Sequence, residues 1–322
     1  MDTVKRMVDM IFSRQLRACV CCPRECGVDR LAGRPGFCGV ADAMPVPFAG
    51  LHFGEEPPIS GTRGSGTIFF GGCNLRCVFC QNHQISQECS TLADVSHVDP
   101  VELAAIMLRI REEGAHNINL VSPSHVALAA ADAIVAARSA GLDIPVVYNS
   151  NGYDSVAVLR QLEGLVDIYL PDFKYADDTL AKRCSGVADY SATAEAALRE
   201  MLRQVGRLRL DDEGIAQRGV LVRHLVLPNE TANSRACLHI LAGIDPRLTV
   251  SIMSQYSPRH KAVSLPGLNR PLHTEEYAEV VDCALELGLE NAFVQDLASQ
   301  DSFVPDFSNE RPFREGFGKK VT

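Results

Sequence analysis

Three cysteines on one short segment are the residues of this chain best suited to chemistry. Cys73, Cys77 and Cys80 have the spacing C-x3-C-x2-C and follow an apolar run, residues 66–70, that is typical of a strand. Thiolates are the usual ligands of iron–sulfur clusters, and an ordinary electron-transfer cubane takes four of them. Three thiolates on one loop can hold three irons and leave the fourth open, and an open metal position distinguishes a reacting site from a structural one. A zinc knuckle or a set of buried thiols is the alternative interpretation.

The cysteine spacing resembles that of the radical S-adenosylmethionine (SAM) superfamily. In that superfamily the open iron of a [4Fe-4S] cluster binds SAM, and reduction of the cluster cleaves SAM to a 5′-deoxyadenosyl radical. Phe79, just before the third cysteine, and Asn82, two residues after it, stand where superfamily members contact the adenine. The resemblance therefore implies a [4Fe-4S] cluster and SAM as cofactors, with a one-electron reductant such as flavodoxin or ferredoxin.

The composition restricts the class of protein. The formal net charge of −9 argues against general nucleic-acid binding, which needs a concentrated basic surface. No run approaches the roughly 18 uninterrupted apolar residues of a membrane span, and residues 1–20 lack the apolar core of an export signal. Twelve cysteines without an export signal indicate a reducing compartment, where thiols serve metals rather than disulfides. We expect a soluble cytoplasmic protein with no membrane partner.

Alternating apolar runs and helical patterns predict the elements that position the cysteine loop. Helical patterns separate the runs, and one of them starts with Asp99 as N-cap, Pro100 in the first turn and Glu102 at the third position. Short strands separated by helices predict βαβ units and a parallel sheet. The strand count suits a partial (β/α)6 barrel, the fold that the resemblance implies, and a doubly wound open sheet is the alternative. The predicted strands are residues 67–71, 117–121, 144–148, 167–170, 220–227 and 248–254, with a seventh at 292–295.

The segment before the first of these strands is different, because it is rich in Gly, Pro and Cys and shows little periodicity. We therefore predict an N-terminal cysteine-rich, metal-binding module over residues 1–63, a radical SAM partial barrel over 64–300 and a C-terminal tail over 301–322. In parallel β/α folds ligands gather beyond the carboxyl ends of the strands. All six main strands end in polar segments, so the sequence predicts one pocket at that edge of the sheet.

Several further segments narrow the resemblance to a family of iron–sulfur proteins related to pyruvate formate-lyase activating enzymes. They are residues 22–26, 55–61, 64–70 and 170–175, together with the cysteine loop. By that resemblance Lys174 contacts the SAM carboxylate, and Asp172 and Ser150 hold a monovalent cation beside it. Three positions depart from the pattern of the activating enzymes. Asn149 stands where those enzymes place an aspartate, and Tyr256 lies near where they use a histidine. Ser122 lies where the motif that binds the SAM amine is found, but the glutamate of that motif is missing here. From the residues alone, Asp172 and Lys174 also suit an ordinary ion pair at a strand end.

A second group of cysteines lies in the N-terminal module. Cys19, Cys22, Cys26 and Cys38 offer four thiolates within 20 residues, with Cys21 as an alternative ligand. Four thiolates suit structural zinc or an auxiliary iron–sulfur cluster, and the spacing does not match the bacterial ferredoxin run. We expect this site to bind a metal and leave open which of the two it holds.

These observations lead to a prediction of function. The chain is expected to be a radical SAM enzyme that abstracts hydrogen from a peptide or protein substrate, such as a glycyl residue of a partner enzyme. A radical SAM enzyme acting on a small molecule is the nearest alternative, and a non-enzymatic adaptor stabilised by zinc is a third. No catalytic side chain is assigned. Polar strand ends that converge on the cysteine loop argue against the adaptor, which has no need of a lined pocket.

Overall fold

The structure is a computed structural model that describes residues 15–92, 95–297, 304–309, 311–314 and 316–320. The first 14 residues of the predicted N-terminal module and part of the predicted tail lie outside the described residues. Within the described part of the chain, no helix is long and apolar enough to cross a membrane.

A ten-stranded sheet forms the centre of the molecule, and seven of its strands, which are adjacent in the sheet, run parallel to one another. Every strand predicted from the apolar runs is present, including the seventh, which confirms the α/β class with a mainly parallel sheet. The runs were recognisable because strands buried on both faces read as continuous apolar segments. Along the sheet the parallel strands are β11 (Ala292–Val294), β10 (Thr249–Met253), β9 (Ala216–Leu225), β7 (Ile168–Pro171), β6 (Val146–Ser150), β5 (Ile118–Val121) and β3 (Ser65–Phe69).

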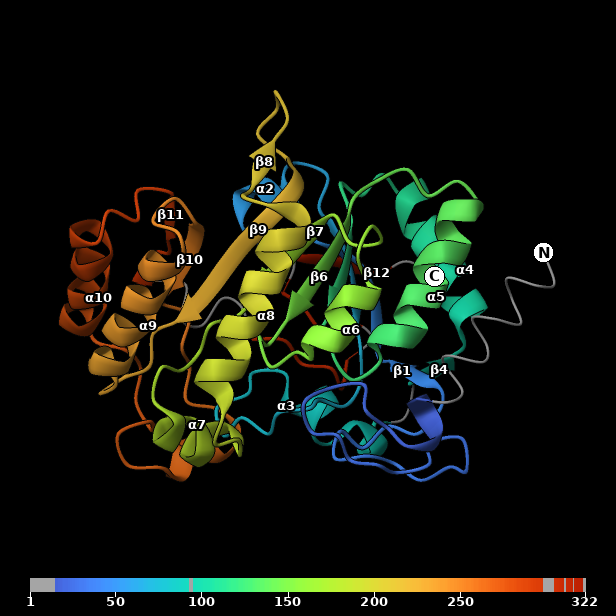
Figure 1. Ribbon diagram of the computed structural model, residues 1–322, viewed down its shortest axis with the longest axis horizontal. Coiled ribbons are helices and arrows are strands. Elements are labelled where there is room, and N and C mark those ends of the chain that lie inside the picture. The colour runs from blue at the N-terminus through green and yellow to red at the C-terminus, as the bar shows by residue number, and fades with distance from the viewer. Residues whose placement is uncertain (1–14, 93–94, 298–303, 310, 315, 321–322) are drawn as a thin grey trace.

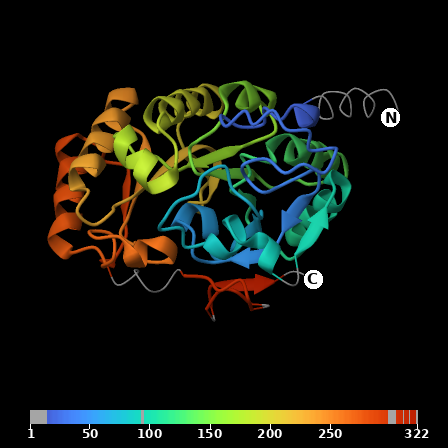
Figure 2. The ribbon, with the colours of Figure 1, turned by 90° about the horizontal axis from the view of Figure 1, so that it is seen from below.

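The long helices form a curved outer layer on one face of this sheet (Figures 1 and 2). This arrangement is that of a partial barrel, since a doubly wound sheet carries helices on both faces. The predicted start of α4 is confirmed: the Asp99 carboxylate accepts hydrogen bonds from the backbone of Val101 and Glu102, and the Glu102 side chain accepts one from the Asp99 backbone. The outer helices are α4 (Pro100–Glu112), α5 (Ala127–Ser139), α6 (Val156–Gln161), α8 (Tyr190–Val205), α9 (Thr231–Ile244) and α10 (Thr274–Glu286).

Shorter helices lie mainly in the loops at the ends of the strands. The sequence analysis did not predict α7, because the helix has only eight residues and follows the polar end of β7 directly. The short elements are α2 (Pro57–Ser60), α3 (His83–Ser86), α7 (Asp178–Ser185) and the 3-10 turns η1 (Cys89–Thr91) and η2 (His260–Ser264).

Segments from both ends of the chain complete the sheet. Strand β2 (Phe48–His52) pairs antiparallel with β3, and β12 (Gly318–Lys320) pairs antiparallel with β2. A separate pair joins β1 (Met44–Val46) to β4 (Ser96–Val98), and the two-residue β8 (Arg209–Leu210) pairs with β9. The predicted boundaries at residues 63 and 300 therefore separate segments that share one sheet.

The inner face of the sheet changes from apolar to polar along the strands. On β6 the buried Val147 is followed on the same face by Asn149, and on β9 Leu221 is followed by Arg223. Val147 and Leu221 belong to an apolar cluster that also contains Ile59 of α2 and closes the amino-terminal side of the barrel. Because side chains alternate between faces, two positions along a strand suffice to move from this apolar layer to a polar one. The polar side chains of the inner face therefore lie toward the carboxyl ends of the strands.

Candidate active site

A cavity of about 510 Å³ lies at the carboxyl ends of the parallel strands. This volume is within the range of about 300–1,000 Å³ that is usual for small-molecule sites. Of the cofactor-binding residues and cysteine-loop thiols predicted from the sequence, all except Tyr256 line the cavity: Cys73, Cys77, Phe79, Cys80, Asn82, Ser122, Asn149, Ser150, Asp172 and Lys174.

The three cysteines of the loop after β3 all face this cavity, and each sulfur has a polar neighbour. The Cys77 sulfur lies 3.0 Å from the Ser185 hydroxyl, and the Cys80 sulfur lies 3.3 Å from the Ser86 hydroxyl. The Cys73 sulfur accepts a hydrogen bond of 3.3 Å from the Asn151 amide. Three thiols from one loop therefore point into a single polar pocket.

The donor set fits a multi-iron cluster better than a single ion. In the metal-free protein, burial and the neighbouring sulfurs raise the pKa of Cys73 to about 12 and that of Cys80 to about 11, so these thiolates need a positive metal centre. Three thiolates from one loop leave one of the four irons of a cubane without a protein ligand, whereas structural zinc is closed by four protein ligands.

The N-terminal segment packs directly on the cysteine loop. The guanidinium groups of Arg24 and Arg76 both lie over the Phe37 ring, at 3.8 and 4.5 Å from its centre. Arg24 also donates a hydrogen bond of 2.9 Å to the backbone oxygen of Asn74. Gly72 adopts φ of +80°, and a Cβ atom there would lie 2.4 Å from the Cys38 carbonyl oxygen. Only glycine permits this approach, so the N-terminal segment and the cysteine loop support each other.

The loops after β6 and β7 are held together by one buried tyrosine. The Tyr190 hydroxyl donates to the backbone oxygens of Asn151, at 2.8 Å, and Asp172, at 3.0 Å, and it accepts from the Lys174 backbone at 3.1 Å. Gly152 has φ of +80°, and a Cβ atom at this position would lie 2.0 Å from the Asp172 carbonyl oxygen. The strand ends that carry Ser150, Asp172 and Lys174 are thus placed as one unit.

Lys174 and Asp172 form an ion pair in the wall of the cavity, with 2.5 Å between the Lys174 Nζ and the Asp172 Oδ2. Burial alone would lower the pKa of Lys174, but Asp172 and the sulfurs of Cys77 and Cys80 outweigh that effect and raise it. The ammonium group therefore stays charged beside the cysteine loop. It is a fixed positive charge that can bind a carboxylate.

Other predicted cofactor residues are engaged by neighbours. The Ser150 hydroxyl donates a hydrogen bond of 2.6 Å to the buried Asp154, which also accepts one of 3.0 Å from Tyr148. Burial raises the pKa of Asp154. Ser122 has φ of +57°, a left-handed conformation that is uncommon outside glycine and costs on the order of 1 kcal/mol.

Tyr256 lies behind the cavity wall rather than in it. Its hydroxyl donates to the Leu268 backbone oxygen at 2.5 Å, and its ring lies 6.0 Å from the ring of Phe79. The structure therefore places Tyr256 as a support for Phe79.

A buried cluster of charged side chains on the cavity wall was missed by the sequence analysis. Arg223 on β9 donates to both oxygens of Glu56, at 2.8 and 2.5 Å, and to Glu55, which in turn contacts His52 at 3.2 Å. Burial alone would raise the pKa of Glu55, but Arg223 and His52 outweigh it and lower the pKa to about 2. The signal that would have found this cluster is an arginine inside the apolar run 220–227, since an unpaired charge is rarely buried.

Side-chain amides form another part of the wall that the sequence analysis did not identify. The Gln81 amide donates a hydrogen bond of 2.7 Å to the backbone oxygen of Gln255, and the Gln295 amide donates one of 2.9 Å to the Gln255 side chain. Gln81, Gln255 and Gln295 all line the cavity, as does Asn82. Amide side chains carry both donors and acceptors, as peptide backbones do.

The second set of cysteines lies together in the N-terminal segment. Cys19 and Cys22 are buried, and the sulfurs of Cys26 and Cys38 lie 3.5 and 3.7 Å from the position that a Cβ atom would take on Gly36. Burial raises the pKa of Cys22 to about 12. A hydrogen bond from Cys21 lowers the pKa of Cys19 to about 5, with a further contribution from the buried Arg30. Four thiols gathered in one segment suit either structural zinc or an iron–sulfur cluster.

Comparisons with known proteins agree with this geometry. The family model described as the radical SAM superfamily matches residues 67–236, just over half of the chain. The uncharacterised protein MJ0674 of Methanocaldococcus jannaschii is 32% identical over 279 residues, which cover 84% of this chain and 75% of that protein. A second uncharacterised protein of the same organism, MJ0808, is 26% identical over 86% of this chain and 80% of its own length.

Solved structures with a similar fold are more distant. The peptide-bound structure of SuiB from Streptococcus suis has a TM-score of 0.48 at 10% identity and covers 70% of this chain and 46% of its own. The hydrogenase maturase HydG from Carboxydothermus hydrogenoformans has a TM-score of 0.46 at 14% identity, with 69% and 50% covered. This chain therefore spans about half of the length of these proteins.

Proposed function

Because the chain belongs to the radical SAM superfamily, whose members use a [4Fe-4S] cluster and SAM, we propose that Cys73, Cys77 and Cys80 hold that cluster. The observation that carries this proposal is the convergence of these three thiols on one polar cavity at the strand ends. When bound and reduced, the cluster supplies the electron that cleaves SAM homolytically.

The remaining wall residues bind and orient SAM. Lys174 holds its carboxylate, and Asp172 places the Lys174 ammonium group through the 2.5 Å ion pair. Phe79 and Asn82 lie on the same loop as the cysteines and contact the adenine, while Ser122 lies on the side of the amine. Asn149 and Ser150 complete this part of the wall, where a monovalent cation binds next to Asp172.

The substrate that we propose is a peptide or a protein segment, with a glycyl residue of a partner enzyme as the specific target. Three glutamine side chains and Asn82 line the wall next to the cysteine loop, and their amides match the donors and acceptors of a peptide backbone. A one-electron reductant such as flavodoxin or ferredoxin supplies the electron. In the N-terminal segment, Cys19, Cys22, Cys26 and Cys38 hold a second metal centre, which is either zinc or an iron–sulfur cluster.

Isotope transfer tests the proposed substrate class. The reduced, anaerobic holoprotein is incubated with SAM and a set of peptides that carry deuterium at the glycyl α-carbon. We expect deuterium in the 5′-deoxyadenosine, because the hydrogen that is abstracted ends up in that product. If none of these peptides transfers deuterium, and unlabelled 5′-deoxyadenosine increases when a small-molecule fraction is added, the small-molecule alternative is favoured instead.

Removal of the Lys174 charge is expected to weaken SAM binding. A hydrogen bond to a charged group contributes about 1.5–3 kcal/mol, so Lys174→Met should raise the dissociation constant of SAM about 10- to 100-fold. Equilibrium binding to the holoprotein measures this change. Lys182→Met, which removes an exposed lysine of α7, is the matched control and should bind SAM as the wild type does. Equal affinity in both variants would show that Lys174 only pairs with Asp172.

A further inference from the structure

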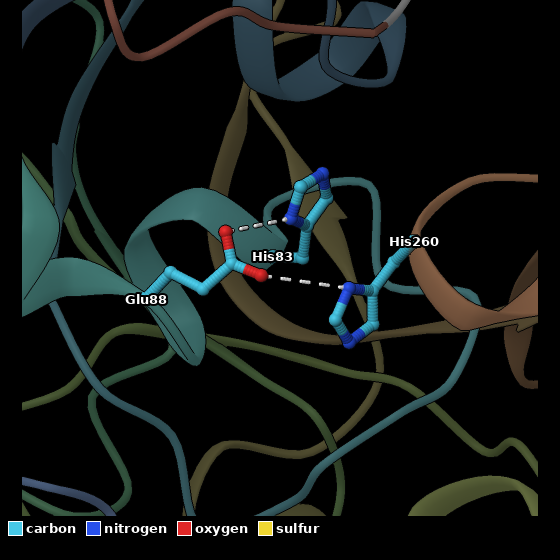
Figure 3. Close-up of side chains that lie close together, drawn as sticks. All are labelled: His83, Glu88 and His260. Carbon is cyan, nitrogen blue, oxygen red and sulfur yellow. Dashed lines mark ion pairs between the residues drawn. The ribbon is translucent and has the colours of Figure 1, made fainter.

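Two histidines and a glutamate meet beside the cysteine loop, in a group that neither the cysteine motifs nor the proposed SAM pocket uses (Figure 3). His83 is the first residue of α3, Glu88 comes just before η1, and His260 is the first residue of η2. One potential ligand atom from each residue lies within 4.8 Å of those from the other two. Among the described residues, this is the place where three such side chains come so close together.

The contacts within this group are too long to be ordinary hydrogen bonds. The Nδ1 atom of His83 lies 3.5 Å from one Glu88 oxygen, and the Nδ1 atom of His260 lies 3.7 Å from the other. Hydrogen bonds between nitrogen and oxygen span about 2.7–3.2 Å. The Nδ1 atom of His83, which faces Glu88, is also buried without a hydrogen-bond partner. A buried polar atom is rarely left in this state, and a ligand between the three side chains would supply the partner that it lacks.

The orientation of the side chains indicates what that partner is. The two imidazole rings are stacked, with 4.8 Å between their centroids and 15° between their planes, and the Glu88 carboxylate faces both (Figure 3). Two imidazole nitrogens and a carboxylate oxygen are donors that first-row divalent cations such as Zn²⁺ prefer, whereas Mg²⁺ and Ca²⁺ prefer oxygen ligands alone.

We propose that His83, Glu88 and His260 bind a divalent transition-metal ion of the zinc class, with three protein ligands and a fourth position open to water. Glu88 is half-exposed, with 45% of its side chain accessible, and so leaves the site open to ions from solution. To bind one ion at Zn–N distances of about 2.0–2.1 Å, the ligand atoms would move closer together and one of the two stacked rings would turn, because a nitrogen lone pair lies in the plane of its ring. This proposal is independent of the proposed SAM chemistry.

An ion at this site would connect two loops that pack on the cysteine loop. Both loops that it would join already contact the cysteine loop: the Ala262 backbone donates to Val78 at 2.9 Å, and the Gln87 amide donates to the Cys77 backbone at 3.0 Å. The ion therefore ties η2, which follows β10, to the segment that follows the cysteines. It fixes two sides of the cavity rim with respect to each other.

Metal analysis of the holoprotein tests this site. Anaerobically purified, iron-loaded protein is equilibrated with micromolar zinc chloride and desalted, and its zinc and iron are measured. We expect Glu88→Gln and the double variant His83→Ala, His260→Ala to retain one equivalent of zinc fewer than the wild type, with unchanged iron. His239→Ala, which removes an exposed histidine of α9, should retain the wild-type amount.

X-ray absorption at the zinc edge identifies the ligands of the lost equivalent. The wild type should show nitrogen and oxygen ligands at about 2.0–2.1 Å, which are distinct from thiolate sulfur at about 2.3 Å. Unchanged iron content in the variants shows that they fold. Equal zinc in the wild type and the double variant, or zinc bound by sulfur alone, would overturn the proposal.

Discussion

Cys77→Ala is expected to abolish 5′-deoxyadenosine formation and to remove about four irons per chain, the content of one cubane. The Cys77 sulfur lies 3.0 Å from the Ser185 hydroxyl, and among the described residues the cysteines that line the cavity are Cys73, Cys77 and Cys80. With two ligands left, the cluster has no stable protein site. Anaerobic iron analysis and product measurement after reduction with SAM present check both effects.

The matched control for this variant is Cys283→Ala, which removes a buried thiol on α10 far from the cavity wall. It should keep its iron and its activity. The iron that remains in Cys77→Ala also reports on the second cysteine set, because a cluster held by Cys19, Cys22, Cys26 and Cys38 would survive the substitution. Retention of full iron and product formation by Cys77→Ala would contradict the assignment of the cysteine loop.

Arg223→Met is expected to destabilise the folded protein by about 3–5 kcal/mol at neutral pH, the usual cost of leaving a buried charge without its partner. The Arg223 guanidinium is the cation between Glu55 and Glu56, and all three side chains are largely buried. The ion-pair contact of His52 is with Glu55, so the substitution would remove the cation that pairs with Glu56. Chemical unfolding of the variant under anaerobic conditions measures the free-energy loss.

The pH dependence separates this charge effect from lost packing. In the wild type the pKa of Glu55 is lowered to about 2, so its contribution to stability is present above its ordinary value of 4.5 and lost as the pH falls toward 2. Without Arg223, burial raises the pKa of Glu55, and its protonation relieves the repulsion between the two carboxylates as the pH falls. The stability difference between wild type and variant should therefore be largest near neutral pH and decrease on acidification.

Arg218→Met on the same strand serves as the control, because Arg218 is exposed and bonds only to the Gln204 backbone oxygen. Such surface substitutions usually change stability by no more than about 0.5 kcal/mol. A difference for Arg223→Met that stayed constant with pH would point to lost packing of the side chain rather than to unpaired carboxylates.

The sequence alone determined which segments form the parallel strands, where the cysteine loop lies and at which edge of the sheet the site forms. Continuous apolar runs mark strands that are buried on both faces, so β3, β5, β6, β7, β9 and β10 were recognisable one by one. The cysteine motif was also recognisable, since its three thiols lie close together in the sequence on one loop. The position of the cavity followed as well, because parallel strands place all their carboxyl ends at one edge.

Only the tertiary structure decided which distant residues meet. Glu55 and Arg223 are 168 positions apart in the sequence, and their contact depends on how the segment before α2 packs against the sheet. The same holds for His83 and His260, which come together because η2 lies on the loop that follows the cysteines. It also holds for β2 and β12, whose pairing at the edge of the sheet has no strong periodic signal. Such contacts arise from the packing of loops and edges, which depends on the whole chain, whereas hydrophobic periodicity and ligand spacing are properties of short segments.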